Sequence, residues 1–317
     1  MLDRDVKEKV VAYEKAGFPP YNTMTPTELR LKFNESAAKA RTLLAEISMA
    51  DVREHLILDA EGRSIKLRIY YPTTEKLLPA QLYFHGGGFV IRDDMDVYDA
   101  TCRLIAKETH TIVVAVDYRL APEDPFPAAI NDCLYAIEWV FKQAGMIGCS
   151  SDRIGVWGES CGGNLALVVS LLLSDQGKFN LSWAVSVSPM LDPSMSTVSY
   201  QQCSSGYFLT KDTMEWFWHH YLPTADCFKN PLVCPKYYHK VDGLPPTFIA
   251  TTQYDPLRDE GKEYADLLKT RSVITTYYNF LGLTHGFFDM YHTVAKAKEA
   301  CDELFEGLNY FIADMDS

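Results

Sequence analysis

The sequence predicts an α/β protein in which helices flank both faces of a mostly parallel central sheet. Three observations support this fold class. From about residue 80 onward, short apolar runs recur, as in strands that are buried on both faces. Segments with helical periodicity separate these runs, which favours right-handed crossovers between parallel strands. The length of 317 residues and the 47% content of hydrophobic residues allow a large core.

The first fifty residues are predicted to be helical. Gly17 and the two prolines that follow it end one helix. Thr25, Pro26 and Glu28 then have the spacing of a capping box, which marks the start of a second helix. The helices after this region are expected at 99–108, 128–143, 162–174, 260–269 and 293–311.

Two kinds of strand pattern follow the N-terminal helices. Residues 65–71 alternate between apolar and polar side chains, as in a strand with one buried face, and would pair with 52–58 through a turn near Gly62. The later strands are continuous apolar runs and are expected to be buried on both faces. They lie at 81–84, 112–116, 154–157, 183–187, 247–250 and 274–278.

About sixty residues separate the strand that ends near 188 from the strand that starts near 247. This is longer than a crossover requires, so it predicts an inserted subdomain with a function. Its middle, residues 210–223, reads as a helix rich in aromatic side chains. These aromatic side chains could pack against the rest of the protein, line a pocket, or do both.

Charge and composition exclude several classes of partner. The chain has 30 Lys and Arg against 42 Asp and Glu, a formal charge of −12, which argues against binding to nucleic acid or to an anionic membrane. Neutral substrates fit this charge best. The longest apolar stretch, 165–173, is much shorter than the roughly 20 residues of a membrane span, and the charged N-terminus does not resemble a secretory signal.

The eight cysteines contain no CxxC pair. Scattered cysteines in a protein with a large core indicate reduced thiols and a cytoplasmic location. Disulfides or a zinc site are the alternative. We expect no metal and no cofactor.

The first chemical motif is a GxSxG sequence in which Gly158, Glu159, Ser160, Cys161 and Gly162 lie between a predicted strand and a predicted helix. A nucleophile on such a sharp turn has a strained backbone, and glycines two positions away let the flanking chains pass. The amides at the start of the following helix point toward the serine oxygen. The motif therefore predicts Ser160 as a nucleophile.

The second motif is His85-Gly86-Gly87-Gly88, directly after the 81–84 strand. Consecutive glycines leave backbone amides unshielded, as an oxyanion hole requires. This motif and GxSxG occur together in lipases and esterases. A glycine-rich turn without a role is the alternative, and no phosphate-binding pattern such as GxGxxG is present.

A nucleophilic serine needs a base and an acid that orients the base. Asp255 follows the 247–250 strand and His285 follows the 274–278 strand, which gives the order Ser160, Asp255, His285. Four other histidines could act as the base, but none of them lies at the end of a predicted strand in the order that a triad requires. They are His219, His220, His239 and His292. The competing acids are Asp259 and Glu260. They would belong to the first turn of a helix, where a carboxylate interacts favourably with the positive end of the helix dipole.

Five ordered motifs between about residues 80 and 290 resemble the hormone-sensitive-lipase-like carboxylesterases, which include the arylacetamide deacetylases. The motifs are HGGGFV at 85–90, DYRLAPE at 117–123, GESCGG at 158–163, DPLRDE at 255–260 and HGF at 285–287. The resemblance implies an α/β-hydrolase fold with a helical cap. It also implies hydrolysis of short- to medium-chain esters without a cofactor.

The resemblance divides the chain into four parts. Residues 1–50 form the N-terminal part of the cap and 190–243 form the cap insertion. Residues 51–189 and 244–317 form the catalytic core. A homodimer is a further expectation from the family.

Carried over to this sequence, the family pattern makes Ser160 the nucleophile, His285 the general base and acid, and Asp255 the residue that orients His285. The amides of Gly87, Gly88 and Cys161 would form the oxyanion hole. The motif at 117–123 would brace the loops near the site.

The chain departs from the family at two positions, because the usual motif around the serine is GDSAGG. Glu159 replaces the aspartate and Cys161 replaces the alanine. Because Cys161 would contribute only its amide, catalysis should persist. Its thiol beside the nucleophile suggests sensitivity to oxidation or heavy metals.

These observations predict a serine carboxylesterase that acts on small neutral esters. The alternative is a receptor-like small-molecule-binding homologue, since some relatives of this fold are hormone receptors that have lost the catalytic histidine. His285 is present here, which argues against that alternative. Amidase, peptidase and long-chain lipase activities are the alternatives among enzymes.

Overall fold

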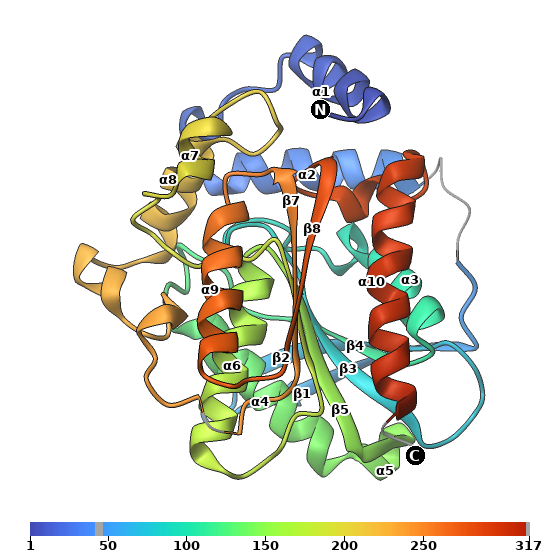
Figure 1. Ribbon diagram of the computed structural model, residues 1–317. Helices are drawn as coiled ribbons and strands as arrows, with labels where there is room; N and C mark the ends of the chain where they lie inside the picture. Colours follow the sequence, from blue (N-terminus) through green and yellow to red (C-terminus); the bar gives the residue numbers. More distant parts are fainter. Residues whose placement is uncertain (42–46, 242, 315–317) are drawn as a thin grey trace.

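The computed structural model describes residues 1–41, 47–241 and 243–314, and in this part of the chain eight strands form one sheet (Figure 1). The strand order is β1-β2-β4-β3-β5-β6-β7-β8. All neighbours from β4 through β3 to β8 are parallel, whereas β2 runs antiparallel to both β1 and β4. The predicted fold class is therefore confirmed. The strands are β1 (Asp51–Leu58), β2 (Ser64–Tyr71), β3 (Leu78–Phe84), β4 (Ile112–Asp117), β5 (Cys149–Glu159), β6 (Ala184–Val187), β7 (Thr247–Tyr254) and β8 (Thr275–Thr284).

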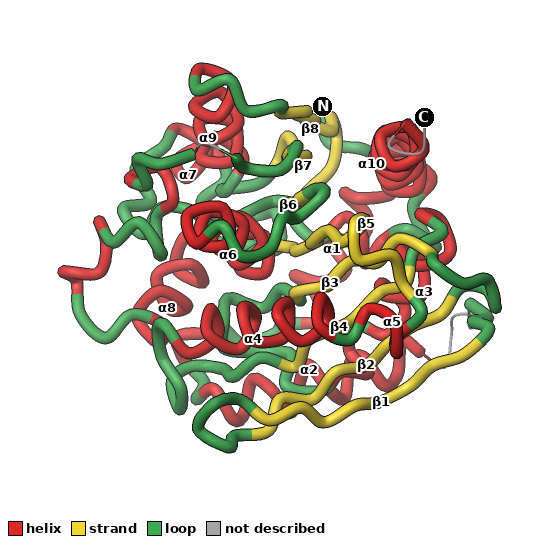
Figure 2. The backbone as a smooth tube through the Cα atoms, turned by 90° about the horizontal axis from the view of Figure 1, so that it is seen from below, coloured by secondary structure: helices red, strands yellow, loops and turns green. Residues whose placement is uncertain are grey.

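Helices cover both faces of the sheet (Figures 1 and 2). On one face lie α3 (Asp99–Thr109) and α10 (Ala295–Asp314). On the other lie α4 (Ala128–Lys142), α6 (Cys161–Gln176) and α9 (Arg258–Thr270). A short helix, α5 (Ala144–Ile147), follows α4.

Successive residues of the central strands pack into two separate cores. On β3, Leu82 and Phe84 join the core beneath α4 and α6, whereas Tyr83 joins the core beneath α3 and α10. On β5, Val156 joins the core beneath α4 and α6, and Trp157 joins the core beneath α3 and α10. Because both faces are buried, the inner positions of these strands are mostly apolar, as the sequence predicted. The buried exception on β3 is Gln81, whose Nε2 donates to Thr109 Oγ1 and Thr111 Oγ1.

The expectation that residues 274–278 are buried on both faces is wrong. Ile274 is 69% exposed, and Thr275 to Tyr278 are only partly buried. The reason is position, because β8 is an edge strand of the sheet. The strand also extends to Thr284, well past its apolar run, since pairing with β7 supplies its backbone hydrogen bonds.

The helices of the two regions expected to form a cap lie at the carboxyl ends of the parallel strands, whereas the last part of the insertion runs beside α9 toward the opposite end of the sheet (Figure 1). The two regions contain α1 (Arg4–Ala16), α2 (Pro26–Arg41), α7 (Val198–Gln202) and α8 (Lys211–Tyr221). A 3-10 turn (Tyr21–Thr23) lies between α1 and α2, and two more (Ala225–Lys229 and Pro235–Tyr237) follow α8. The capping box is present: the Thr25 amide donates to Glu28 Oε2 at 2.8 Å, and the Glu28 amide donates to Thr25 Oγ1 at 3.3 Å. Within the expected helical region, residues 42–46 lie outside the described residues and 47–50 are not helical.

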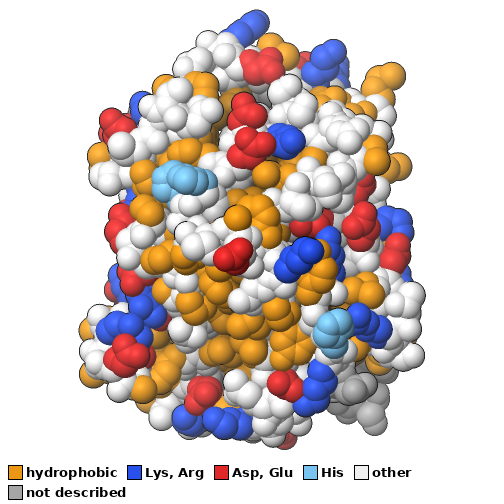
Figure 3. All heavy atoms as spheres, turned by 90° about the vertical axis from the view of Figure 1, so that its left-hand side faces the viewer, with side chains coloured by type: hydrophobic (Ala, Val, Ile, Leu, Met, Phe, Trp, Pro, Cys, Tyr) orange, Lys and Arg blue, Asp and Glu red, His pale blue; other side chains and the backbone are white. Residues whose placement is uncertain are grey.

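The surface on the side of the insertion mixes charged side chains with hydrophobic ones (Figure 3). Val198, Phe228 and Tyr237 are exposed hydrophobic residues of the insertion. All eight cysteines are free thiols. Among the described residues, no helix has the length and apolar character to cross a membrane, and no cluster of three His, Cys, Asp or Glu side chains could hold a metal ion.

Candidate active site

Ser160 lies on a sharp turn between β5 and α6. Its backbone has φ 57° and ψ −119°, a conformation that is strained for a residue with a side chain. The Ser160 amide donates to Val187 O at 2.8 Å, and its carbonyl accepts from the Asn164 and Met190 amides. These contacts hold the strained turn in place, as the GxSxG motif predicted.

The glycines of the motif allow the turn because backbones pass very close to them. A Cβ on Gly158 would lie 1.9 Å from Gly162 O, and a Cβ on Gly162 would lie 2.0 Å from Phe84 O. Both obstacles are backbone atoms, which cannot rotate away. The spacing of the motif therefore has the steric cause expected from the sequence.

We expect Gly162→Ala to destabilise the fold by about 3 kcal/mol or more, because the added methyl forces β3 and α6 apart. Denaturant unfolding measures the change. The matched control is Gly145→Ala in α5, where a Cβ meets no atom within 4 Å. That variant should be unchanged or slightly more stable, since alanine favours a helix. Equal stability of the two variants would contradict the steric explanation.

The glycine loop after β3 approaches both Ser160 and helix α8 of the insertion. Gly87 and Gly88 have positive φ angles of 117° and 60°. A Cβ on Gly88 would lie 2.1 Å from Phe217 Cγ, so α8 rests directly on the loop. In the described part of the chain no residue accepts a hydrogen bond from the amides of Gly87 and Gly88, so both donors are available to a ligand.

His85 braces this loop. Its buried ring stacks between Tyr98 and Tyr118, with centroid distances of 4.6 and 4.2 Å. Its Nδ1 lies 2.7 Å from Gly86 O. Burial lowers the pKa of His85 to about 3, so the ring is neutral and donates from Nδ1.

The expectation that the Cys161 thiol is open to oxidation or metals is not supported by the structure. The side chain is fully buried, and Sγ accepts from the Phe89 amide at 3.1 Å. Burial raises the pKa of the thiol, which disfavours the reactive thiolate. Cys161 packs behind the turn, while its backbone begins α6.

Asp255 and His285 meet at the ends of β7 and β8. His285 Nδ1 donates to Asp255 Oδ2 at 2.8 Å, and the Leu257 amide donates to Asp255 Oδ1 at 2.8 Å. Asp255 is fully buried and the His285 side chain is 17% exposed. Burial opposes protonation of His285, but the charge and hydrogen bond of Asp255 outweigh it, so the pKa of His285 is raised.

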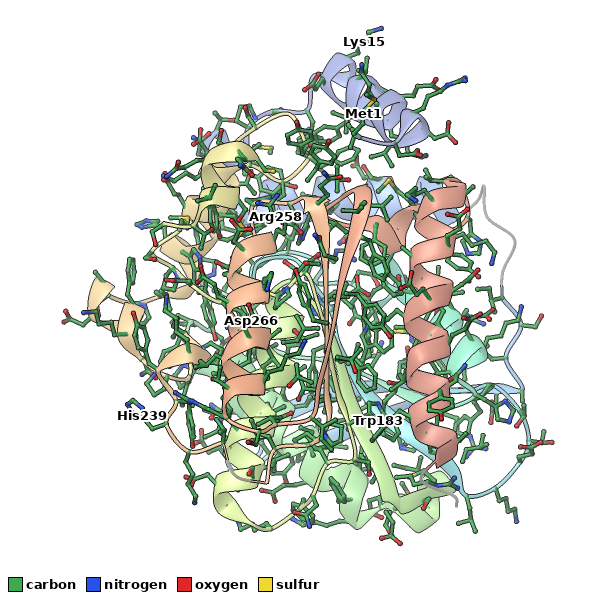
Figure 4. The ribbon with its side chains drawn as sticks, viewed as in Figure 1. Met1, Lys15, Trp183, His239, Arg258 and Asp266 are labelled. Carbon is green, nitrogen blue, oxygen red and sulfur yellow. The ribbon has the colours of Figure 1, made fainter. Side chains whose placement is uncertain are left out.

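None of the competing histidines lines the cavity that contains Ser160 and His285. His239 lies toward the opposite end of the sheet (Figure 4), and His219 and His220 belong to α8. The competing acids lie in the first turn of α9, as expected. Asp259 accepts from the Ser199 amide and Glu260 from the Leu191 amide, so both bind the insertion.

The motif at 117–123 braces the loops as the resemblance implied. Arg119 forms a bidentate pair with the buried Asp132. Glu123 binds the guanidinium of Arg30 through both carboxylate oxygens, at 2.9 and 2.8 Å. Arg30 also donates to Val90 O, which ties α2 to the glycine loop. Nothing in the sequence singled out Arg30, because its partners lie 60 or more positions away.

A cavity of about 670 Å³ lies between these loops, the N-terminal helices and the insertion. Ser160, His285 and the glycines 86–88 line one part of it. Aromatic side chains of the N-terminal region and the insertion line another: Tyr13, Phe18, Tyr21, Phe33, Phe208 and Phe217. Phe217 comes from the aromatic helix of the insertion, whose Trp218 and Tyr221 are buried, so both interpretations of that helix are correct.

Arg92, Glu159 and Asp289 line the same cavity as Ser160. Arg92 Nη2 pairs with Asp289 Oδ2 at 2.9 Å, and Tyr83 donates to Glu159 Oε1 at 3.1 Å. Burial, with the charge of Asp289, raises the pKa of Glu159 to about 7. Sequence reasoning missed Arg92 and Asp289, which lie in no recognised position of a motif.

The fold and this arrangement of loops define an α/β hydrolase. The family described as having the alpha/beta hydrolase fold matches residues 81–289, and the chain belongs to that family. The arylesterase of Saccharolobus solfataricus is 32% identical over 287 residues, which cover 90% of this chain and 92% of that protein. Carboxylesterase NlhH of Mycobacterium tuberculosis is 35% identical over 240 residues, covering 74% and 75% of the two chains.

Solved structures agree with these relatives. A thermostable esterase from Pseudomonas putida ECU1011 has a TM-score of 0.92 and 30% identity, covering 98% of both chains. A hyperthermophilic esterase from Pyrobaculum calidifontis has a TM-score of 0.92 and 33% identity at the same coverage. The expectation of a carboxylic ester hydrolase is thus confirmed at the level of the enzyme class.

Proposed function

We propose that the protein is a serine carboxylesterase in which Ser160, His285 and Asp255 form the catalytic triad. One observation carries the proposal: the hydrogen-bonded pair of His285 and Asp255 lines a single cavity with Ser160 and with the unoccupied amides of the glycine loop. The esterase names of the relatives support the same chemistry.

In the proposed mechanism, Ser160 Oγ attacks the ester carbonyl while His285 Nε2 accepts its proton. Asp255 holds His285 with its proton on Nδ1, so Nε2 is free to act as the base. The amides of Gly87, Gly88 and Cys161 stabilise the tetrahedral oxyanion. His285 then protonates the leaving alcohol, and water activated by His285 releases the acid.

The cap segments at 1–50 and 190–243 define the substrate in this proposal. Their aromatic side chains provide an apolar surface beside Ser160, which suits a neutral ester with a short to medium chain. A cavity of about 670 Å³ has room for a small ester.

A series of p-nitrophenyl esters from acetate to palmitate tests this substrate class. We expect kcat/KM to be greatest at two to eight acyl carbons and to fall at least about 10-fold by sixteen, in line with the short- to medium-chain esters that the family resemblance implies. A maximum at palmitate would indicate a lipase instead. A protein that binds the short esters without turnover would support the receptor-like alternative.

We also propose a cytoplasmic location. All eight cysteines are free, and seven of them are buried. Free thiols persist in a reducing compartment, where disulfides are rare.

A further inference from the structure

The cavity beside Ser160 has two chemically distinct linings. Tyr21 packs against Phe18, Phe33 and Phe217 with ring centroids 5.7 to 6.0 Å apart, so these aromatic side chains are continuous. Three charged lining residues group together on the side of the core, because Arg92 pairs with Asp289 and both act on the Glu159 carboxyl. A further charged lining residue, Lys9, comes from α1.

Among these three charged residues, Glu159 has no ion pair of its own in the described part of the chain. Arg92 Nη2 pairs with Asp289 Oδ2 at 2.9 Å, so the charges of Arg92 and Asp289 offset each other. Glu159 Oε1 accepts from Tyr83, a neutral donor. Among the described residues, no donor is found for Glu159 Oε2, and Glu159 is a partly buried residue that lines the cavity.

We infer that Glu159 forms a polar subsite that favours ester substrates carrying a protonated amine near the ester group and disfavours those carrying a carboxylate. The inference rests on the proposed esterase function, since Glu159 directly precedes Ser160 in the chain. An ammonium N–H supplies the donor that Oε2 lacks, in a charge-assisted hydrogen bond. A carboxylate at the same place meets the negative charges of Glu159 and Asp289, and Arg92, the cation beside them, is already paired with Asp289.

The pH dependence of this preference has a definite sign. The groups that face the Glu159 carboxyl are Tyr83 from β3, Arg92 from the loop after β3, and His285 and Asp289 from the region after β8. The pKa of Glu159 is about 7, so the carboxyl is increasingly ionised as the pH rises from 6 to 8. The preference for the ammonium ester should therefore increase over this range.

Two sets of nearly isosteric esters test the subsite from both sides of the scissile bond. The butanoate esters have 3-methylbutyl, 2-(dimethylamino)ethyl and 2-carboxyethyl as the alcohol group. The ethyl esters have 4-methylpentanoate, 3-(dimethylamino)propanoate and hydrogen succinate as the acyl group. In each set the end group is neutral, cationic or anionic with little change of shape. The measured quantity is the ratio of kcat/KM for the cationic ester to that for the neutral ester.

We expect this ratio to exceed 1 in at least one set and to fall about 10-fold or more in Glu159→Gln, which keeps the size of the side chain and an acceptor for Tyr83. The ratio should also lose its change with pH. The matched control is Glu299→Gln on α10, whose side chain is 73% exposed and remote from the cavity, and which should leave the ratio unchanged.

An unchanged ratio in Glu159→Gln would overturn the inference, as would an equal loss of rate on all six esters, which would indicate a general role for Glu159. If Glu159→Gln fails to fold, the pH dependence of the ratio in the unaltered enzyme decides the matter, and a flat ratio overturns the inference. Failure of the proposed function looks different: the unaltered enzyme would then hydrolyse none of the neutral esters.

Discussion

Ser160→Ala should lower kcat for p-nitrophenyl butanoate by about 10⁴-fold or more while leaving the fold intact. The alanine removes the hydroxyl of the proposed nucleophile, so any remaining rate would come from the oxyanion amides and from binding. The Ser160 side chain makes no hydrogen bond with a described residue that the fold would lose. Stopped-flow or steady-state absorbance at saturating substrate measures the change.

A fluorophosphonate provides a second measurement for the same residue. It should inactivate the unaltered enzyme and add its mass to the peptide that contains Ser160, and Ser160→Ala should take up no label. Ser151→Ala is the matched control, because Ser151 is an exposed serine on β5 outside the cavity. Full activity of Ser160→Ala, or labelling at another serine, would disprove the proposed nucleophile.

Asp255→Asn should lower kcat by roughly 10³- to 10⁴-fold without unfolding the protein. Both carboxylate oxygens of Asp255 accept hydrogen bonds, one from the Leu257 amide and one from His285 Nδ1. Asparagine offers one acceptor and one NH₂ donor. If its oxygen keeps the Leu257 amide, the NH₂ group faces Nδ1 and moves the imidazole proton to Nε2, where His285 can no longer act as a base.

The pH profile distinguishes this effect from a general loss of structure. In the unaltered enzyme kcat/KM should fall as the pH drops through the raised pKa of His285, because the protonated ring cannot accept a proton from Ser160. Asp255→Asn removes the charge that raises that pKa, so the acid limb of the residual activity should move to lower pH. A residual profile with an unshifted acid limb would contradict the proposed role of Asp255. Asp259→Asn is the matched control, since Asp259 lies in the next turn and binds the insertion.

The predicted and observed elements agree best where burial is complete. The central strands β3, β4 and β5 are covered on both faces, so their apolar runs are visible without knowledge of their neighbours. At the edge the same reasoning fails, because β8 has partly buried residues and continues to Thr284 through its pairing with β7. Strand length at an edge depends on a partner strand that lies far away in the sequence.

Local chemistry explains why the candidate triad was predicted from sequence. GxSxG and HGGG are short motifs whose glycines have steric causes within a few residues or on the adjacent strand. Asp255 and His285 follow two strands that are consecutive in the chain and parallel in the sheet. The carboxyl ends of these strands therefore lie next to each other at the same end of the sheet. Each of these signals can be read from a short motif or from the order of motifs along the chain.

The sequence alone therefore determined the fold class, the family resemblance and the candidate residues at the strand ends, because all of these depend on local pattern and chain order. Tertiary structure decided the rest. It buried the Cys161 thiol, brought Arg30 to Glu123, and placed Arg92 and Asp289 beside Glu159. Arg92 and Asp289 are 197 positions apart. Their charges interact only because folding brings three loops to one cavity, and no pattern along the chain encodes that distance.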